Sequence, residues 1–297
     1  MQISTNQFYT SNQRNLQSLT ATADKLQVQV STGKKLNAPS DDAVGYRRLQ
    51  GLIRDGSNDQ AYAGNITIVS SALSQADTSL KSITDEIQRA QELAVKANSG
   101  TLSASDRSVI ADELDSIVKT LTDLANAKDS RGASIFAGGD SPAVIANPDG
   151  SFTFATTGPT AIPIGDSSSA APGEAASRLF VDSSGGNVLA DISSLSAALR
   201  GTGDVAAIAS TVGDKLTASN SQVSAVQGSL GARAQRVDIE SSRMADLATD
   251  REVTRSAIED TDVTQAITDL QKTMTILSAA QASFTKLSNL SLFDYLK

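Results

Sequence analysis

The chain has 297 residues with no Cys, His or Trp, and its formal net charge at pH 7 is −8. Without His or Cys it lacks the commonest general base, the usual transition-metal ligands and a thiol nucleophile, so we expect no enzyme, metal site or other cofactor. The acidic balance argues against nucleic-acid binding. No apolar run approaches the roughly 20 residues that span a membrane, so we expect no membrane partner.

The first predicted element is an N-terminal helix with one apolar stripe on an otherwise polar surface. The stripe consists of Tyr9, Leu16, Leu19, Ala23, Leu26 and Val30. A single thin helix cannot bury such a stripe, so this helix needs a partner helix. The first residues lack a signal-peptide pattern, so if the protein is extracellular we expect export without a cleaved signal.

A joint between two helices is predicted after this element, in the segment VSTGKKLNAPSDDA at 30–43. Gly33 is expected to end the first helix, and Pro39 cannot continue it. Ser40, Asp41 or Asp42 can then cap the next helix. The inter-domain joint is therefore assigned to Gly33, Pro39, Asp41 and Asp42.

The next part of the chain has the spacing of coiled-coil helices. Apolar residues alternate at steps of three and four along Ile66, Val69, Leu73, Ala76, Leu80, Ile83, Ile87, Ala90 and Ala94. Such a pattern indicates a helix that packs along one seam. Asn98-Ser-Gly100 is expected to end it, and Ser103 or Ser105 to cap a shorter helix.

A different composition marks 136–203 as an insert. Five of the six prolines lie within 142–172. The segment SFTFAT at 151–156 alternates as a strand does, and it follows a turn sequence, NPDG at 147–150. We therefore predict a small β-rich insert.

Two more helices are predicted after the insert. Apolar residues at steps of seven, from Leu216 to Met244, predict a long helix over roughly 205–258. Gly228 and Gly231 suggest a bend or a close helix crossing within it. The C-terminal helix has its own stripe, which includes Val263, Ile267, Leu270, Met274, Leu277, Phe284 and Leu287.

The predicted fold is mainly α: an elongated helical rod of long coiled-coil-like helices from both chain ends, with the insert in the middle. The two terminal helices are expected to pair, yet a pair leaves Phe8, Phe284, Phe293 and Tyr295 exposed, which predicts neighbouring molecules. We assign the assembly interface to Leu16, Leu19, Leu26, Val30, Ile267, Leu270, Met274, Leu277 and Phe284.

Two segments resemble motifs of the bacterial flagellins and their hook-associated relatives. VSTGKKLN at 30–37, followed by PSDDA at 39–43, is similar to the signature near the start of these proteins, and LGARAQRVD at 230–238 to their C-terminal motif. Gln235 stands where many flagellins have Asn. The hook-associated branch is favoured by the opening MQISTNQFY, by IFAG at 135–138 and by the ending NLSLFDYL at 289–296.

The resemblance implies a secreted structural subunit of the bacterial flagellum. It implies an inner coiled-coil domain formed by 1–38 and 263–297, and an outer helical bundle formed by 39–135 and 204–262. Export would use the flagellar type III apparatus, with a chaperone on the C-terminal helix. For the hook-associated branch, it implies a ring that joins hook to filament, templates filament growth and contacts a neighbouring hook-associated junction protein and flagellin.

Three alternatives remain open. A filament-forming flagellin is the nearest, and a helical tip or translocator protein of type III secretion is more remote. An enzymatic rival would be a Ser–Lys hydrolase, although Ser31 and Lys34 match its Ser-x-x-Lys spacing without any pattern of a globular pocket.

Overall fold

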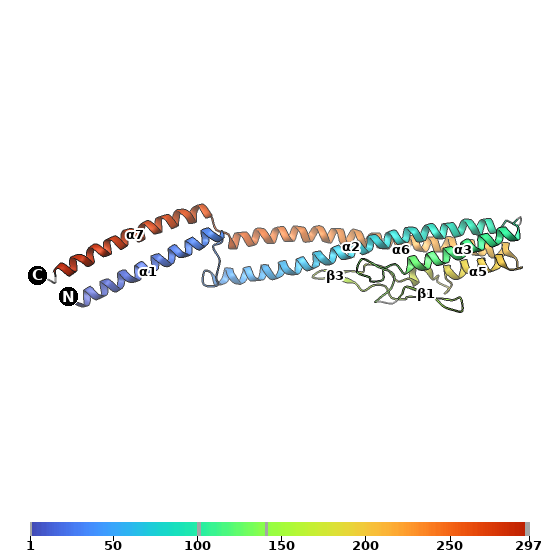
Figure 1. Ribbon diagram of the computed structural model, residues 1–297, viewed down its shortest axis with the longest axis horizontal. Helices are drawn as coiled ribbons and strands as arrows, with labels where there is room; N and C mark the ends of the chain where they lie inside the picture. The colour runs from blue at the N-terminus through green and yellow to red at the C-terminus, as the bar shows by residue number, and fades with distance from the viewer. Residues whose placement is uncertain (1, 100–101, 140–141, 295–297) are drawn as a thin grey trace. The chain divides into compact units, whose positions relative to one another are not determined.

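The computed structural model describes residues 2–99, 102–139 and 142–294, with side chains described between 7 and 286. The chain forms two compact units, the first made of residues 1–58 and 247–297 and the second of 59–246. Helices account for 72% of the chain and two small hairpins lie in its middle (Figure 1). This confirms the predicted mainly-α class, whereas the predicted domain boundaries stay predictions.

The first unit contains the two terminal helices, α1 (Gln2–Thr32) and α7 (Val263–Asp294), which pack side by side (Figure 1). They run antiparallel, because the Tyr9 ring contacts the Phe284 ring edge-to-face with centroids 5.6 Å apart, while an antiparallel bridge joins Lys34 to Asp260. The predicted pairing of the terminal helices is confirmed. The side chains of Leu287 and Phe293, and Tyr295 as a whole, lie outside the described residues.

Two 55-residue helices, α2 (Ala43–Ala97) and α6 (Val205–Glu259), run through both units. In the second unit all nine residues of the predicted seam from Ile66 to Ala94 are buried, and so are Leu216, Val223, Leu230, Val237 and Met244. Polar bonds accompany this packing: Gln91 Nε2 donates to Thr217 Oγ1 at 2.6 Å and Gln227 Nε2 to Asp77 Oδ1 at 2.8 Å. The seams predicted from spacing are therefore confirmed.

Helix α3 (Ala104–Ala125) follows the predicted stop after Ala97. Ser103 caps it, since its hydroxyl accepts from the amide of Asp106 at 3.2 Å while the Asp106 carboxylate accepts from the amide of Ser103. This reciprocal capping satisfies two amides that the first helical turn leaves free. Of the two predicted caps Ser103 is the one used, and Gly100 lies outside the described residues.

The expectation of a close helix crossing at Gly228 and Gly231 is wrong. Helix α6 continues through both residues, and a Cβ atom on either would meet nothing within 4 Å. The glycines face open space, so they lower helix propensity without making room for a neighbour.

The insert contains two antiparallel hairpins. Strand β1 (Val144–Ala146) pairs with β2 (Phe152–Phe154), and β3 (Ile162–Gly165) pairs with β4 (Ser168–Ala170). The predicted strand and turn are confirmed by β2 and by the bond from the Asn147 amide to the Ser151 carbonyl at 2.8 Å. A short helix α4 (Ser177–Phe180) follows.

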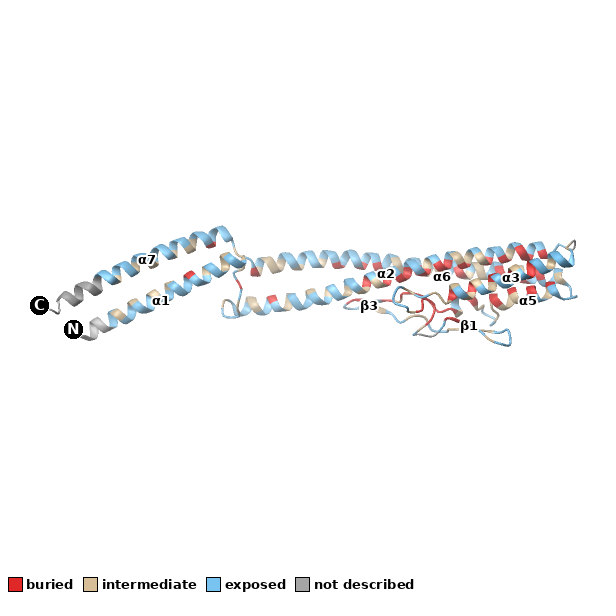
Figure 2. Ribbon diagram, viewed as in Figure 1, coloured by how far each residue is buried: buried red, intermediate tan, exposed pale blue. Residues whose placement is uncertain are grey.

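Helix α5 (Val188–Arg200) packs against α3 and was not predicted. Its buried Val188, Ile192, Leu195 and Leu199 recur at steps of four and three, a helical signal that the surrounding Ser and Gly residues obscure. In Figure 2 buried residues recur along α3 and α5, whereas α1 and α7 are mostly exposed. No described helix is both long and apolar enough to cross a membrane.

Candidate assembly surface and joint

The predicted assembly interface divides into two groups of residues. Seven of its nine members are half-buried along the contact between α1 and α7: Leu16, Leu19, Leu26, Val30, Leu270, Leu277 and Phe284. Ile267 and Met274 instead remain 40% and 51% exposed. The structure therefore brings seven of the residues together as the seam of the helix pair and leaves two outside it.

The residues outside the seam belong to exposed apolar flanks of α7. Val263, Ile267 and Met274 are exposed and lie on one face, because they are spaced by four and seven residues. Ile276 is exposed on the opposite flank of the seam, and α1 adds exposed Phe8 and Val28. Two helices thus bury one seam only, and apolar side chains on both flanks stay available for further helices.

The joint begins where Gly33 ends α1. Its φ of +71° lies in the left-handed region, which glycine adopts at low cost. A Cβ atom at this position would meet nothing within 4 Å, so the backbone conformation rather than space requires the glycine. Leu36, three residues on, is buried.

Two carboxylates organise the rest of this connector. Asp41 Oδ2 accepts from the amides of Asn37 and Ala38 at 3.1 and 3.0 Å, and its Oδ1 pairs with Lys25 Nζ at 2.9 Å. The Lys25 ammonium and the two amides hold the pKa of Asp41 below its usual value. Asp42 Oδ1 accepts from the amide of Val44 at 2.9 Å and so caps α2, while Pro39 is exposed in the intervening turn.

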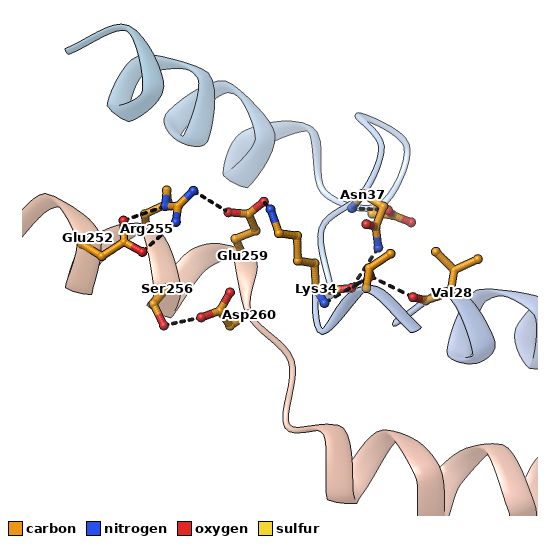
Figure 3. A network of polar contacts seen from close by, with 10 residues as sticks. Val28, Lys34, Asn37, Glu252, Arg255, Ser256, Glu259 and Asp260 are labelled. Carbon is orange, nitrogen blue, oxygen red and sulfur yellow. Dashed lines mark hydrogen bonds and ion pairs between the residues drawn. The ribbon is translucent and has the colours of Figure 1, made fainter. Parts of the chain in front are cut away.

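The second connector, between α6 and α7, bonds to the first (Figure 3). The amide of Lys35 donates to the carbonyl of Glu259 at 2.8 Å, and the amide of Thr261 to the carbonyl of Gly33 at 2.9 Å. The Lys34 ammonium pairs with the Glu259 carboxylate, which is buried. The two connectors are therefore held together by two backbone hydrogen bonds and one ion pair.

An arginine extends this ion pair along α6. Arg255 binds Glu252 at 2.6 Å and lies 3.8 Å from the Glu259 carboxylate (Figure 3). Sequence reasoning missed Lys34, Arg255 and Glu259, because Lys34 and Glu259 are 225 residues apart and no local pattern links them. The one sequence signal for this contact is indirect. Each connector adjoins one of the two terminal helices that are predicted to pair, so the connectors are expected to lie close together.

We expect Asp41→Asn to loosen the joint at neutral pH by about 1 kcal/mol, because the neutral amide loses the attraction of Lys25. Since the folded pKa of Asp41 is lowered, its carboxylate stabilises the joint above the ordinary Asp pKa of about 4, and this contribution is lost as the pH falls below that value. Amide hydrogen exchange at Asn37 and Ala38 measures the difference between variant and native protein.

The matched control is Asp24→Asn, which removes an exposed carboxylate on α1 next to Lys25. It should leave exchange at Asn37 and Ala38 unchanged. An Asp41 effect that is equally large below pH 4 would contradict the role of its charge.

Among the described residues, no group of three or more Asp or Glu side chains is placed to hold a metal ion. The terminal unit offers an exposed apolar helix surface and a hydrogen-bonded joint between helices.

Comparison with known proteins agrees with this architecture. Residues 3–141 match the bacterial flagellin N-terminal helical region and residues 214–296 the C-terminal helical region. The chain is 37% identical over 138 residues to flagellar hook-associated protein 3 of Salmonella typhimurium, and 27% identical over 126 residues to flagellin of Listeria monocytogenes. These matches cover 46% and 42% of this chain and only 44% of each relative.

A solved flagellar hook-associated protein from Vibrio parahaemolyticus shares the fold. Its TM-score is 0.69 at 20% identity, and the superposition covers 74% of this chain and all of that one. The two matched helical regions together cover well over half of the chain and lie in the order that flagellins have. This chain belongs to the flagellin family.

Proposed function

We propose that this protein is a structural subunit of the bacterial flagellum that forms the junction between hook and filament and templates filament growth. The observation that carries the proposal is the terminal helix pair, whose seam is only half-buried and whose flanks expose Ile267, Met274 and Ile276. Such a pair becomes fully covered only among neighbouring helices, as in an assembly of subunits.

The junction role is favoured over a filament role by the degree of relatedness. The relative of 37% identity carries the name hook-associated protein 3, and the flagellin relative reaches 27%. The opening, the IFAG segment and the ending of the sequence point the same way. A filament-forming flagellin is the second candidate, and spontaneous growth of the purified protein into long fibres would favour it.

Partners and location follow from this role. The subunit would associate with its own copies in a ring, with a neighbouring hook-associated junction protein on one side and with flagellin on the other. It would be extracellular, exported without a cleaved signal, and its C-terminal helix α7 would bind a chaperone before export. The exposed apolar flanks of α7 suit that contact, because a chaperone would shield them until assembly.

The test is deletion of the gene, followed by electron microscopy of the cells and an assay of flagellin in the medium. Bare hooks with monomeric flagellin released, both reversed by returning the gene, are the expected result. Normal filaments after deletion would overturn the junction role. Loss of the hook as well would place the protein elsewhere in the flagellum.

A further inference from the structure

A basic stripe lies on the first turns of α2, in the first unit. It consists of Val44, Arg47, Arg48 and Arg54, which are spaced so that they share one face of the helix. Leu49, on the opposite face, is buried, so the stripe points away from the packed side. Val44 is 67% exposed and all three arginines are exposed.

The arginines of this stripe have no carboxylate partner among the described residues. Arg47 Nε donates to the carbonyl of Ala43 at 3.3 Å, and no ion pair or hydrogen bond involves the side chains of Arg48 and Arg54 within the described ranges. Several other arginines of the described residues do pair with a carboxylate, among them Arg89, Arg131, Arg178, Arg200, Arg233, Arg243 and Arg255. The basic stripe therefore keeps its charge available to another molecule.

An acidic stripe lies on α6 in the second unit and consists of Asp238, Ile239, Ser242 and Asp246. All four are exposed, and Ile239 is 60% exposed, while Val237 and Met244 are buried on the other side of the helix. Over the part of the chain that is described, neither Asp238 nor Asp246 forms a side-chain ion pair. Both stripes therefore combine an exposed aliphatic residue with uncompensated charge.

We infer that the basic stripe of one copy docks on the acidic stripe of a second copy. The inference rests on the proposed function and adds to it a specific contact between subunits. The three arginines of the basic stripe carry three positive charges, and the exposed Asp55 beside Arg54 carries one negative charge, which leaves a net charge of about +2. The two carboxylates of the acidic stripe carry the opposite charge in the same amount. Val44 and Ile239 supply the apolar centre that a charged helix contact needs, and arginine is enriched in such contacts.

The contact joins two different surfaces, so it is head-to-tail. Each copy that offers its acidic stripe to one neighbour keeps its basic stripe free for another. Repeated contacts of this type close into a ring or continue as a helix. The inferred contact is therefore of the kind that an assembling subunit requires, and it lies outside the α1–α7 pair.

Disulfide cross-linking tests the contact, because the chain has no cysteine of its own. Full-length Val44→Cys protein is mixed with full-length Ile239→Cys protein at high concentration and oxidised gently. The mixed dimer is expected in at least about tenfold excess over the dimer that Val44→Cys forms with Val109→Cys. Val109 is the matched control, since it is 63% exposed on α3 outside both stripes.

Charge reversal tests the electrostatic part. Adding Arg47→Glu and Arg48→Glu to the Val44→Cys protein should lower the mixed-dimer yield about tenfold, because like charges then face each other. Asp238→Arg with Asp246→Arg in the Ile239→Cys protein should restore it. Equal yields with Val109→Cys, or reversal without effect, would overturn the inference. The gene-deletion experiment is independent of these variants. If deletion gives bare hooks but the Val44–Ile239 cross-link shows no excess, the inferred contact is wrong and the proposed junction role still holds.

Discussion

Gly173→Ala is expected to separate part of the insert from helix α6 within the second unit. Gly173 is buried, and a Cβ atom there would lie 1.9 Å from the carbonyl oxygen of Ile135 and 3.2 Å from Pro159 Cγ. The closest of these atoms belongs to the backbone, so one segment must move to make room. Overpacking of this kind costs about 3 kcal/mol.

The movement would also disturb the polar contacts beside Gly173. Arg233 Nη1 on α6 donates to the Gly173 carbonyl at 2.6 Å, and the same guanidinium pairs with the buried carboxylate of Glu174. Glu174 also pairs with Arg178 at 3.0 Å, so displacement would cost this buried carboxylate one of its two arginine partners and favour local opening. Hydrogen exchange at Ala176, whose amide donates to the Phe136 carbonyl at 2.8 Å, should accelerate about a hundredfold.

Gly228→Ala is the matched control, because a Cβ atom at Gly228 meets nothing within 4 Å in the middle of α6. Alanine should stabilise the exposed helix by up to about 1 kcal/mol. Native exchange at Ala176 in the Gly173→Ala protein would show that the two segments separate easily and that the close approach is unimportant.

The contrast between these two glycines shows what the sequence can predict. Spacing alone predicted the seams of α2 and α6, because a regular stripe on a long helix has one way to be buried. It gave the wrong expectation for Gly228 and no expectation for Gly173, since the space around a glycine depends on which segment passes it. Such contacts are made between residues far apart in the chain.

The same limit applies to the assembly surface and joint. The turn chemistry of Gly33, Asp41 and Asp42 is local, and the structure places these residues where one helix ends and the next begins. The ion pair of Lys34 with Glu259 joins distant connectors and left no local signal. Hydrophobic residues identified the stripe on α7, but only the position of α1 decides that Leu270 lies in the seam and Ile267 outside it.

Because Leu270 lies in the seam between α1 and α7, Leu270→Asp is the most direct test of the terminal helix pair. The aspartate would place a charge in a seam that has no second layer of side chains to compensate it, at a cost of about 2 kcal/mol or more. We expect α1 and α7 to separate while the second unit stays folded, and we expect the variant not to enter flagella. Far-UV circular dichroism measures the first effect, and filament counts in complemented deletion cells measure the second.

Ile267→Asp separates docking from folding, because Ile267 lies three residues from Leu270 but on the exposed flank of α7. This variant should keep the circular dichroism of the native monomer and still lower the fraction of cells with filaments at least about tenfold, since the flank is where a neighbouring helix would pack. Thr268→Asp, an exposed polar site on the same turn, should change neither measurement. Native filament numbers with Ile267→Asp would mean that neighbours do not cover this flank, and a loss of helicity in Leu270→Asp beyond that of α1 and α7 would mean that the seam supports more than the terminal pair.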